Sequence, residues 1–191
     1  MGEKRQARQG ADVLLQEEPL RFQTRKQVGL LGGNFNPVHL AHLVMADQVQ
    51  NQLGLDKVYL MPTYLPPHVD EKKTISSEHR LAMLELAVAD NPCLDIEPIE
   101  LIRKGKSYTY DTMKALKEAN PDTDYYFIIG GDMVEYLPKW HRIDDLLHLV
   151  QFVGIRRPNY PTESTYPIIW VDVPQMAISS TLIRQKVKSG C

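Results

Sequence analysis

The chain has 191 residues, enough for one domain with a complete core, and its 43% hydrophobic and 24% charged residues are typical of globular proteins. A formal net charge of -2 gives no overall positive field for nucleic acid or anionic lipid, and no apolar run approaches the roughly 20 residues of a membrane helix. With a charged N-terminus unlike a signal peptide and only Cys93 and Cys191, far apart, we expect a cytoplasmic protein without a nucleic-acid or membrane partner.

The first 27 residues have weak apolar periodicity, and we expect a poorly ordered N-terminal extension there. A single domain is expected over residues 28–191. In chain order the pattern predicts these elements: a strand at 28–31, a helix from Pro37 to 53 capped by Asn36, a strand at 57–61, a helix at 76–90, an extended segment at 94–102, a helix at 110–119, a strand at 125–129, a helix at 143–149, strands at 151–155 and 168–171, and a last helix from Ser179 or Ser180 to 188.

Strands that alternate with helices imply right-handed crossovers and therefore a doubly wound, mostly parallel α/β sheet. Ligands of such sheets bind beyond the carboxyl ends of the strands. We therefore expect the chemistry of this protein in the loops that follow Leu31, Met61, Ile129 and Val171.

The loop and helix start at residues 32–42 carry the strongest functional signal. Gly32 and Gly33 let the backbone approach a phosphate closely, and the helix that follows offers free N–H groups and the positive end of its dipole. His39 and His42 share one helix face near that end, where imidazoles can donate hydrogen bonds to phosphate oxygens and stabilise the charge of a departing group. For either histidine alone, capping or packing is the simpler interpretation.

The start of the last helix is a second candidate anion site. Hydroxyl groups of Ser180 and Thr181 add donors to the free backbone N–H groups, and Arg184 lies one turn further along the helix. Taken alone, this segment is better interpreted as an ordinary serine cap followed by a solvated arginine.

The two segments resemble the G-x-F-x-P-x-H-x-x-H and I-S-S-T-x-x-R signatures of the nucleotidyltransferase superfamily. The resemblance implies a Rossmann-like nucleotidyltransferase fold that holds ATP from two sides, with His39, His42 and Arg184 as catalytic residues. Asn36 stands where many members have Asp. Asp132 is left open between the ATP ribose, a metal reached through water and a simple turn. The ATP-binding residues implied are Gly32, Gly33, Asn34, Phe35, His39, His42, Gly130, Asp132, Ser180, Thr181 and Arg184.

Three middle segments, at residues 61–68, 107–112 and 127–140, resemble the nicotinate mononucleotide adenylyltransferases. In that family a tryptophan stacks on the nicotinate ring, a role that falls here on Trp140. Arg80 is left open between a phosphate contact and a solvated or capping position. Arg156 and Arg157 are left open between a place beside the adenine or phosphates and a solvated loop. The mononucleotide-binding residues implied are Asn34, His68, Tyr108, Thr109, Lys139 and Trp140.

The resemblance thus predicts adenylyl transfer from ATP to nicotinate mononucleotide in NAD synthesis, with Mg²⁺ bound through the ATP phosphates and no assigned protein ligand. Transfer to nicotinamide mononucleotide or to phosphopantetheine is the alternative reaction. An inactive nucleotide-binding module is the alternative of another class, and homo-oligomerisation is left open.

Overall fold

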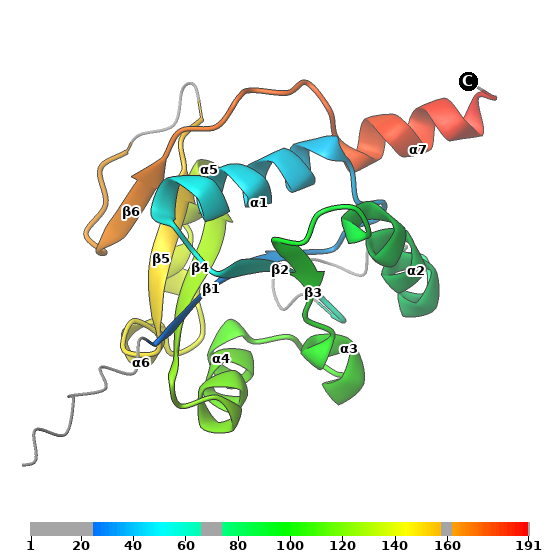
Figure 1. Cartoon of the computed structure of the whole chain (residues 1–191). Coiled ribbons are helices and arrows are strands. Elements are labelled where there is room, and N and C mark those ends of the chain that lie inside the picture. Colours follow the sequence, from blue (N-terminus) through cyan, green and yellow to red (C-terminus); the bar gives the residue numbers. More distant parts are fainter. Residues whose placement is uncertain (1–24, 66–73, 158–161, 191) are drawn as a thin grey trace, which may run out of the picture.

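The computed structural model describes residues 25–65, 74–157 and 162–190 (Figure 1). Six parallel strands form one sheet: β1 (Lys26–Gly33), β2 (Lys57–Pro62), β3 (Leu94–Ile96), β4 (Thr123–Gly130), β5 (Val150–Ile155) and β6 (Ile168–Val171). Their order across the sheet is β3-β2-β1-β4-β5-β6, so the strand order reverses direction between β1 and β4. The predicted doubly wound α/β sheet is confirmed, and every neighbouring pair in it is parallel.

The described part of the chain contains eight helical segments, seven in the connections between strands and α7 after the last strand. They are α1 (Leu40–Leu53), α2 (Ser77–Val88), α3 (Ile99–Arg103), α4 (Thr109–Ala119), α5 (Gly131–Val134), the 3-10 turn η1 (Leu137–Lys139), α6 (Ile143–Leu146) and α7 (Ser180–Lys188). Within the described ranges, none of these helices has the length and apolar character needed to cross a bilayer.

The core consists of two apolar clusters, one on each face of the sheet. Leu30 points into the cluster that includes Met113 of α4 and Leu146 of α6. Leu31, the next residue of β1, points into the cluster that includes Val49 of α1 and Leu84 of α2. This alternation along β1 produces the three-layer arrangement seen in Figure 1, with α1 and α4 on opposite sides of the sheet.

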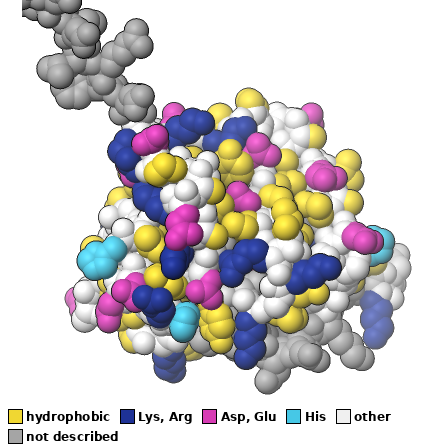
Figure 2. All heavy atoms as spheres, turned by 90° about the horizontal axis from the view of Figure 1, so that it is seen from below, with side chains coloured by type: hydrophobic (Ala, Val, Ile, Leu, Met, Phe, Trp, Pro, Cys, Tyr) yellow, Lys and Arg dark blue, Asp and Glu magenta, His cyan; other side chains and the backbone are white. Residues whose placement is uncertain are grey.

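Figure 2 shows the molecule from below the view of Figure 1. On this face Lys and Arg side chains are interspersed with Asp and Glu side chains rather than gathered into one basic stripe. The view agrees with the small net charge of the sequence.

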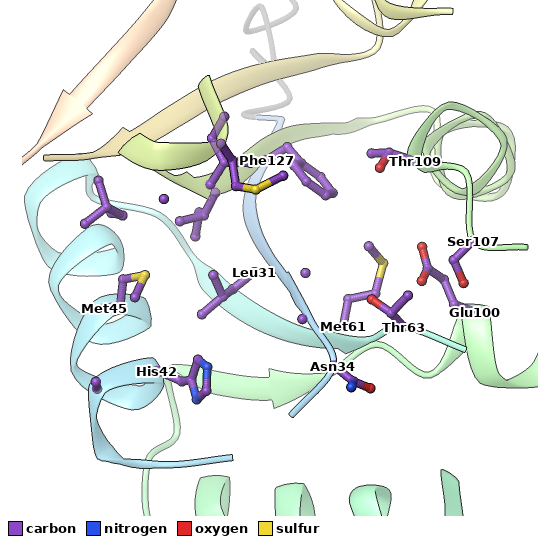
Figure 3. A pocket seen from close by; sticks show the side chains of 18 of the residues that line it. Leu31, Asn34, His42, Met45, Met61, Thr63, Glu100, Ser107, Thr109 and Phe127 are labelled. Atoms are coloured by element: carbon purple, nitrogen blue, oxygen red, sulfur yellow. The ribbon is translucent and has the colours of Figure 1, made fainter. Parts of the chain in front are cut away.

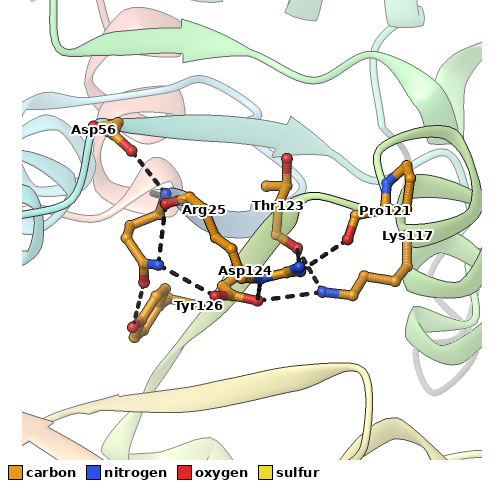
Figure 4. A network of polar contacts seen from close by, with 8 residues as sticks. Arg25, Asp56, Lys117, Pro121, Thr123, Asp124 and Tyr126 are labelled. Atoms are coloured by element: carbon orange, nitrogen blue, oxygen red, sulfur yellow. Dashed lines mark hydrogen bonds and ion pairs between the residues drawn. The ribbon is translucent and has the colours of Figure 1, made fainter. Parts of the chain in front are cut away.

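The start of β1 is held by a polar network at the amino ends of the central strands, away from the carboxyl ends where the site is predicted (Figure 4). Arg25 Nε lies 2.9 Å from Asp124 Oδ1, and the Gln27 N–H donates to Asp56 Oδ2 at 2.7 Å. Because of these contacts β1 begins at Lys26, earlier than the predicted strand at 28–31. Residues 1–24 of the predicted N-terminal extension lie outside the described residues.

Four predicted elements were wrong in part. Helix α1 begins at Leu40 with His39 as its N-cap, not at Pro37 with Asn36 as the cap, because the chain is still turning at Phe35, whose φ is +45°. The segment 94–102 is not extended throughout: β3 ends at Ile96 and α3 follows. The predicted helices at 76–90 and 143–149 exist but end earlier, at Val88 and Leu146.

Candidate active site

A cavity of about 1500 Å³ opens at the carboxyl ends of the central strands. Its walls come from the loops after β1, β2 and β4 and from the segment between β6 and α7, as the strand order predicts. Figure 3 shows His42 and Met45 of α1 on one side and Glu100, Ser107 and Thr109 on the other. The predicted site residues that line this cavity are Gly32, Gly33, Asn34, His39, His42, Tyr108, Thr109, Gly130 and Trp140.

His39 and His42 form a stacked pair at the start of α1. Their ring centroids are 3.7 Å apart, and Phe35 packs its edge against His42 at 5.0 Å. The backbone N–H of His39 donates to His42 Nδ1 at 3.2 Å. A neutral imidazole that accepts at Nδ1 carries its proton on Nε2, so His42 keeps one N–H donor for a ligand.

Burial sets the charge of this pair. It lowers the pKa of His42 to about 4, with smaller contributions from the charges of His39 and Arg157, and it also lowers the pKa of His39. Both rings are therefore neutral near pH 7 in the free protein. An anion beside them would raise both pKa values and favour the protonated, doubly donating form.

The two segments that carry the sequence signatures meet in the fold. Ser180 Oγ donates to the carbonyl oxygen of Pro37 at 2.8 Å, and Arg184 Nη1 donates to the carbonyl oxygen of Asn36. Arg184 Nη2 also donates to Thr181 Oγ1 at 3.1 Å. The first turn of α7 therefore lies against the turn that leads into α1. Ser180, Thr181 and Arg184 border this turn and are not among the residues that line the cavity.

Trp140 also lines the cavity. It packs edge-on against Phe127 and Phe152, with centroids 5.9 Å apart in each case, so it also packs against the core. Its Nε1 is buried without a hydrogen-bond partner among the described residues.

Two other residues predicted to contact the mononucleotide are not among the described residues that line the cavity. Lys139 is exposed, and its Nζ lies 5.5 Å from the centroid of the Tyr136 ring. The predicted contact residue His68 lies outside the described residues.

The end of β4 carries an ion pair. Arg157 Nη1 lies 3.4 Å from Asp132 Oδ1, and Arg157 lines the cavity whereas Asp132 does not. Of the positions that the sequence left open for Arg157, the structure thus favours the one beside the cavity, where a guanidinium group can face phosphate or base.

Comparisons with known proteins agree with this architecture. The family model described as cytidylyltransferase-like matches residues 30–186. A Streptococcus pneumoniae protein named probable nicotinate-nucleotide adenylyltransferase is 64% identical over 174 residues, which cover 91% of this chain and 83% of that protein. The chain belongs to the nicotinate-nucleotide adenylyltransferase family. A Streptococcus mutans relative with the same name has the same identity and coverage.

Solved structures of more distant nicotinate-nucleotide adenylyltransferases share the fold. The Plasmodium falciparum nicotinic acid mononucleotide adenylyltransferase complexed with NaAD has a TM-score of 0.69 at 19% identity, and the match covers 84% of this chain and 83% of that one. A Vibrio parahaemolyticus protein described as a putative nicotinate-nucleotide adenylyltransferase has a TM-score of 0.64 at 18% identity, with 86% and 88% covered.

The sequence did not indicate that Arg80 of this adenylyltransferase is buried and structural. The side chain is only 2% exposed, and Nη1 donates to the carbonyl oxygens of Asn34 at 2.9 Å and Thr63 at 2.8 Å. Its burial lowers the pKa of the guanidinium group. The signal in the sequence is the spacing to Leu84, since both residues lie on the buried face of α2. Arg80 therefore joins the glycine turn to the end of β2.

The Asn34 side chain is held from two sides. Its Nδ2 donates to Thr74 Oγ1 at 3.1 Å, and its Oδ1 accepts from Arg80 at 3.3 Å.

Glu100 was not predicted as a site residue, because residues 94–102 were interpreted as extended. Helix α3 instead turns its side chain into the cavity wall.

Proposed function

We propose that this chain transfers the AMP part of ATP to nicotinate mononucleotide, which yields nicotinate adenine dinucleotide and pyrophosphate, a step of NAD biosynthesis. The observation that carries the proposal is the contact between Ser180 of α7 and Pro37 of the turn before α1. It brings two helix N-termini and the paired imidazoles together beside a cavity that Trp140 also lines.

The reaction needs no protein nucleophile, because a phosphate oxygen of the mononucleotide is already ionised and can attack the α-phosphorus of ATP directly. Catalysis then consists of positioning the two phosphates and stabilising the charge on the departing pyrophosphate. In our proposal His42 Nε2 and His39 donate to the triphosphate from the α1 side. Ser180, Thr181 and Arg184 approach it from the α7 side, where backbone N–H groups are also free.

The described residues contain no group of three or more metal-ligating His, Cys, Asp or Glu side chains. This composition fits a Mg²⁺ ion that arrives with ATP, since Mg²⁺ keeps several waters and often binds through substrate phosphates. Such an ion would neutralise phosphate charge as pyrophosphate leaves. The protein's own contribution remains the imidazoles, the arginines and the helix N-termini.

In the same cavity we propose that Trp140 stacks on the pyridine ring, while Tyr108 and Thr109 border it. Trp140 is already fixed edge-on by Phe127 and Phe152, so little side-chain freedom would be lost on binding. Polar groups of the surrounding backbone can accept either the acid or the amide of the ring.

A substrate panel tests the proposal. The protein is mixed with ATP and Mg²⁺ and with nicotinate mononucleotide, nicotinamide mononucleotide or phosphopantetheine, and pyrophosphate release is measured. We expect the highest kcat/KM with nicotinate mononucleotide. Preference for one of the other acceptors would replace the proposed substrate, and absence of pyrophosphate with all three would identify an inactive nucleotide-binding module.

A further inference from the structure

Glu100 is a buried acid in the cavity wall with no part in the chemistry proposed above. Its side chain is 5% exposed, and the residue lines the cavity. Thr112 Oγ1 donates to Glu100 Oε1 at 3.0 Å, and the Ser107 side chain hydrogen-bonds to the same carboxyl group. Figure 3 shows Glu100 and Ser107 next to each other on the side of the cavity opposite His42.

The two partners of Glu100 bracket the segment expected to contact the mononucleotide. Ser107 precedes Tyr108 and Thr109, which both line the cavity, and Thr112 follows them in the first turns of α4. Ser107 Oγ accepts from the Tyr64 N–H at 3.1 Å, so the loop after β2 is tied to the same point. One carboxyl group of α3 thus joins α4, the loop before it and, through Ser107, the loop after β2.

Burial of this carboxyl group is unfavourable in itself. It raises the pKa of Glu100, although the hydrogen bonds of Ser107 and Thr112 and the charge of Arg103 lower it. The desolvation cost is offset only if the hydrogen bonds are kept. Truncation of Glu100 would remove the carboxyl acceptor of two hydroxyl groups, both on elements of the cavity wall. Thr112 would keep the Arg103 guanidinium group and the more distant carbonyl oxygen of Tyr108, at 3.3 Å, and Ser107 would keep the Tyr64 N–H. Thr112 is fully buried and could not turn to solvent instead.

We propose that Glu100 is a positioning residue for the mononucleotide, which holds Tyr108 and Thr109 at their places in the cavity wall through its hydrogen bonds to Ser107 and Thr112. The inference rests on the proposed function. Glu100 acts on the far end of the cavity from the stacked histidines, so its influence falls on one substrate and not on the other.

The test compares steady-state KM values for both substrates in Glu100→Ala and Glu100→Gln. We expect Glu100→Ala to raise the KM for nicotinate mononucleotide about tenfold, as loss of a buried hydrogen-bond partner can do, while the KM for ATP stays within about twofold. Glu100→Gln keeps an acceptor oxygen for Thr112. It should restore the KM for the mononucleotide to within about threefold of the wild-type value.

Glu97→Ala is the matched control. Glu97 is a partly buried acid near the start of α3, and its Oε1 accepts a hydrogen bond from the Ile99 N–H at 3.0 Å. Unlike Glu100, it does not line the cavity. We expect Glu97→Ala to lower thermal stability and to leave both KM values unchanged.

If Glu100→Ala does not fold, Thr112→Val takes its place, because this substitution removes the hydroxyl donor and keeps the side-chain shape. It should raise the mononucleotide KM alone.

The outcomes separate this inference from the proposed function. If the wild-type protein releases no pyrophosphate with any mononucleotide, the proposed function is wrong and the inference falls with it. If the wild type is active and Glu100→Ala and Thr112→Val leave the mononucleotide KM unchanged, the inference alone is wrong. A parallel rise of both KM values in these variants would show a general structural role and would also overturn it.

Discussion

Ser180 donates a hydrogen bond to the carbonyl oxygen of Pro37 across 143 positions of sequence. Through this bond the first turn of α7 is held against the turn that precedes α1, and Arg184 reinforces the contact by donating to Asn36. In the proposed function, the triphosphate is held from two sides only because this contact brings the two helix N-termini together.

Replacement of Ser180 by alanine tests this contact. Ser180→Ala removes the donor to Pro37, and we expect the KM for ATP to rise about three- to tenfold, with the mononucleotide KM nearly unchanged. Ser189→Ala is the control, since Ser189 lies at the other end of α7 and donates only locally, to Lys186. If steady-state kinetics give the same KM for ATP in Ser180→Ala and Ser189→Ala, the proposed role of Ser180 is wrong.

The charge-stabilising role of His42 predicts an effect on turnover. His42→Ala removes the Nε2 donor, and kcat should fall about 100-fold or more, with a much smaller change in the KM for ATP. His148→Ala is the control because His148 is exposed and does not line the cavity. A normal kcat in His42→Ala would show that this imidazole does not face the reacting phosphates.

The low pKa of His42 predicts a pH dependence of stability. Between its ordinary pKa of 6.5 and the folded value of about 4, the unfolded chain binds a proton at this position and the folded chain does not. The contribution of neutral His42 to stability is therefore complete above pH 6.5 and is lost as the pH falls toward 4. At pH 5 the loss is at most about 2 kcal/mol.

Urea unfolding at pH 7 and pH 5 measures this contribution when the wild type is compared with His42→Gln. The variant should lose less stability on acidification. Burial raises the pKa of Glu97 and Glu100, which favours the folded state as the pH falls, but both acids are present in both proteins. Equal losses would mean that His42 titrates normally in the folded chain.

Trp140 is expected to act on the mononucleotide only. Trp140→Ala should raise the KM for nicotinate mononucleotide by about tenfold or more and leave the KM for ATP nearly unchanged. It should also lower the melting temperature, because Trp140 packs on Phe127 and Phe152. Trp140→Phe keeps an aromatic face and should recover most of the affinity. Equal changes in both KM values would refute stacking.

The order of strands and helices could be predicted from the sequence, because buried parallel strands are short apolar runs ended by glycine or proline. Local turns were harder. The N-cap of α1 is His39 rather than the predicted Asn36. The backbone at Phe35 has a positive φ, which cannot be predicted from a phenylalanine in the sequence. Helix α3 was missed because its five residues are too few for a periodic pattern.

The candidate site was predictable where glycine, histidine or a hydroxyl follows a strand or opens a helix, as for Gly33, His42 and Ser180. Arg80 and Glu100 are different, because a charged residue in a sequence normally indicates a solvated face. Their burial depends on contacts with Asn34 and Thr112, which are distant in sequence and meet them only in the folded chain.

Helix α7 has nine residues and none of them is buried. A helix of this length is only marginally stable in water on its own. Its order therefore depends on the polar bonds of its first turn, the same turn that would grip the triphosphate. A nucleotide that contacts both α1 and α7 would stabilise the helical form of α7. Variants with a higher affinity for ATP should therefore also show stronger protection of the α7 amide hydrogens from exchange.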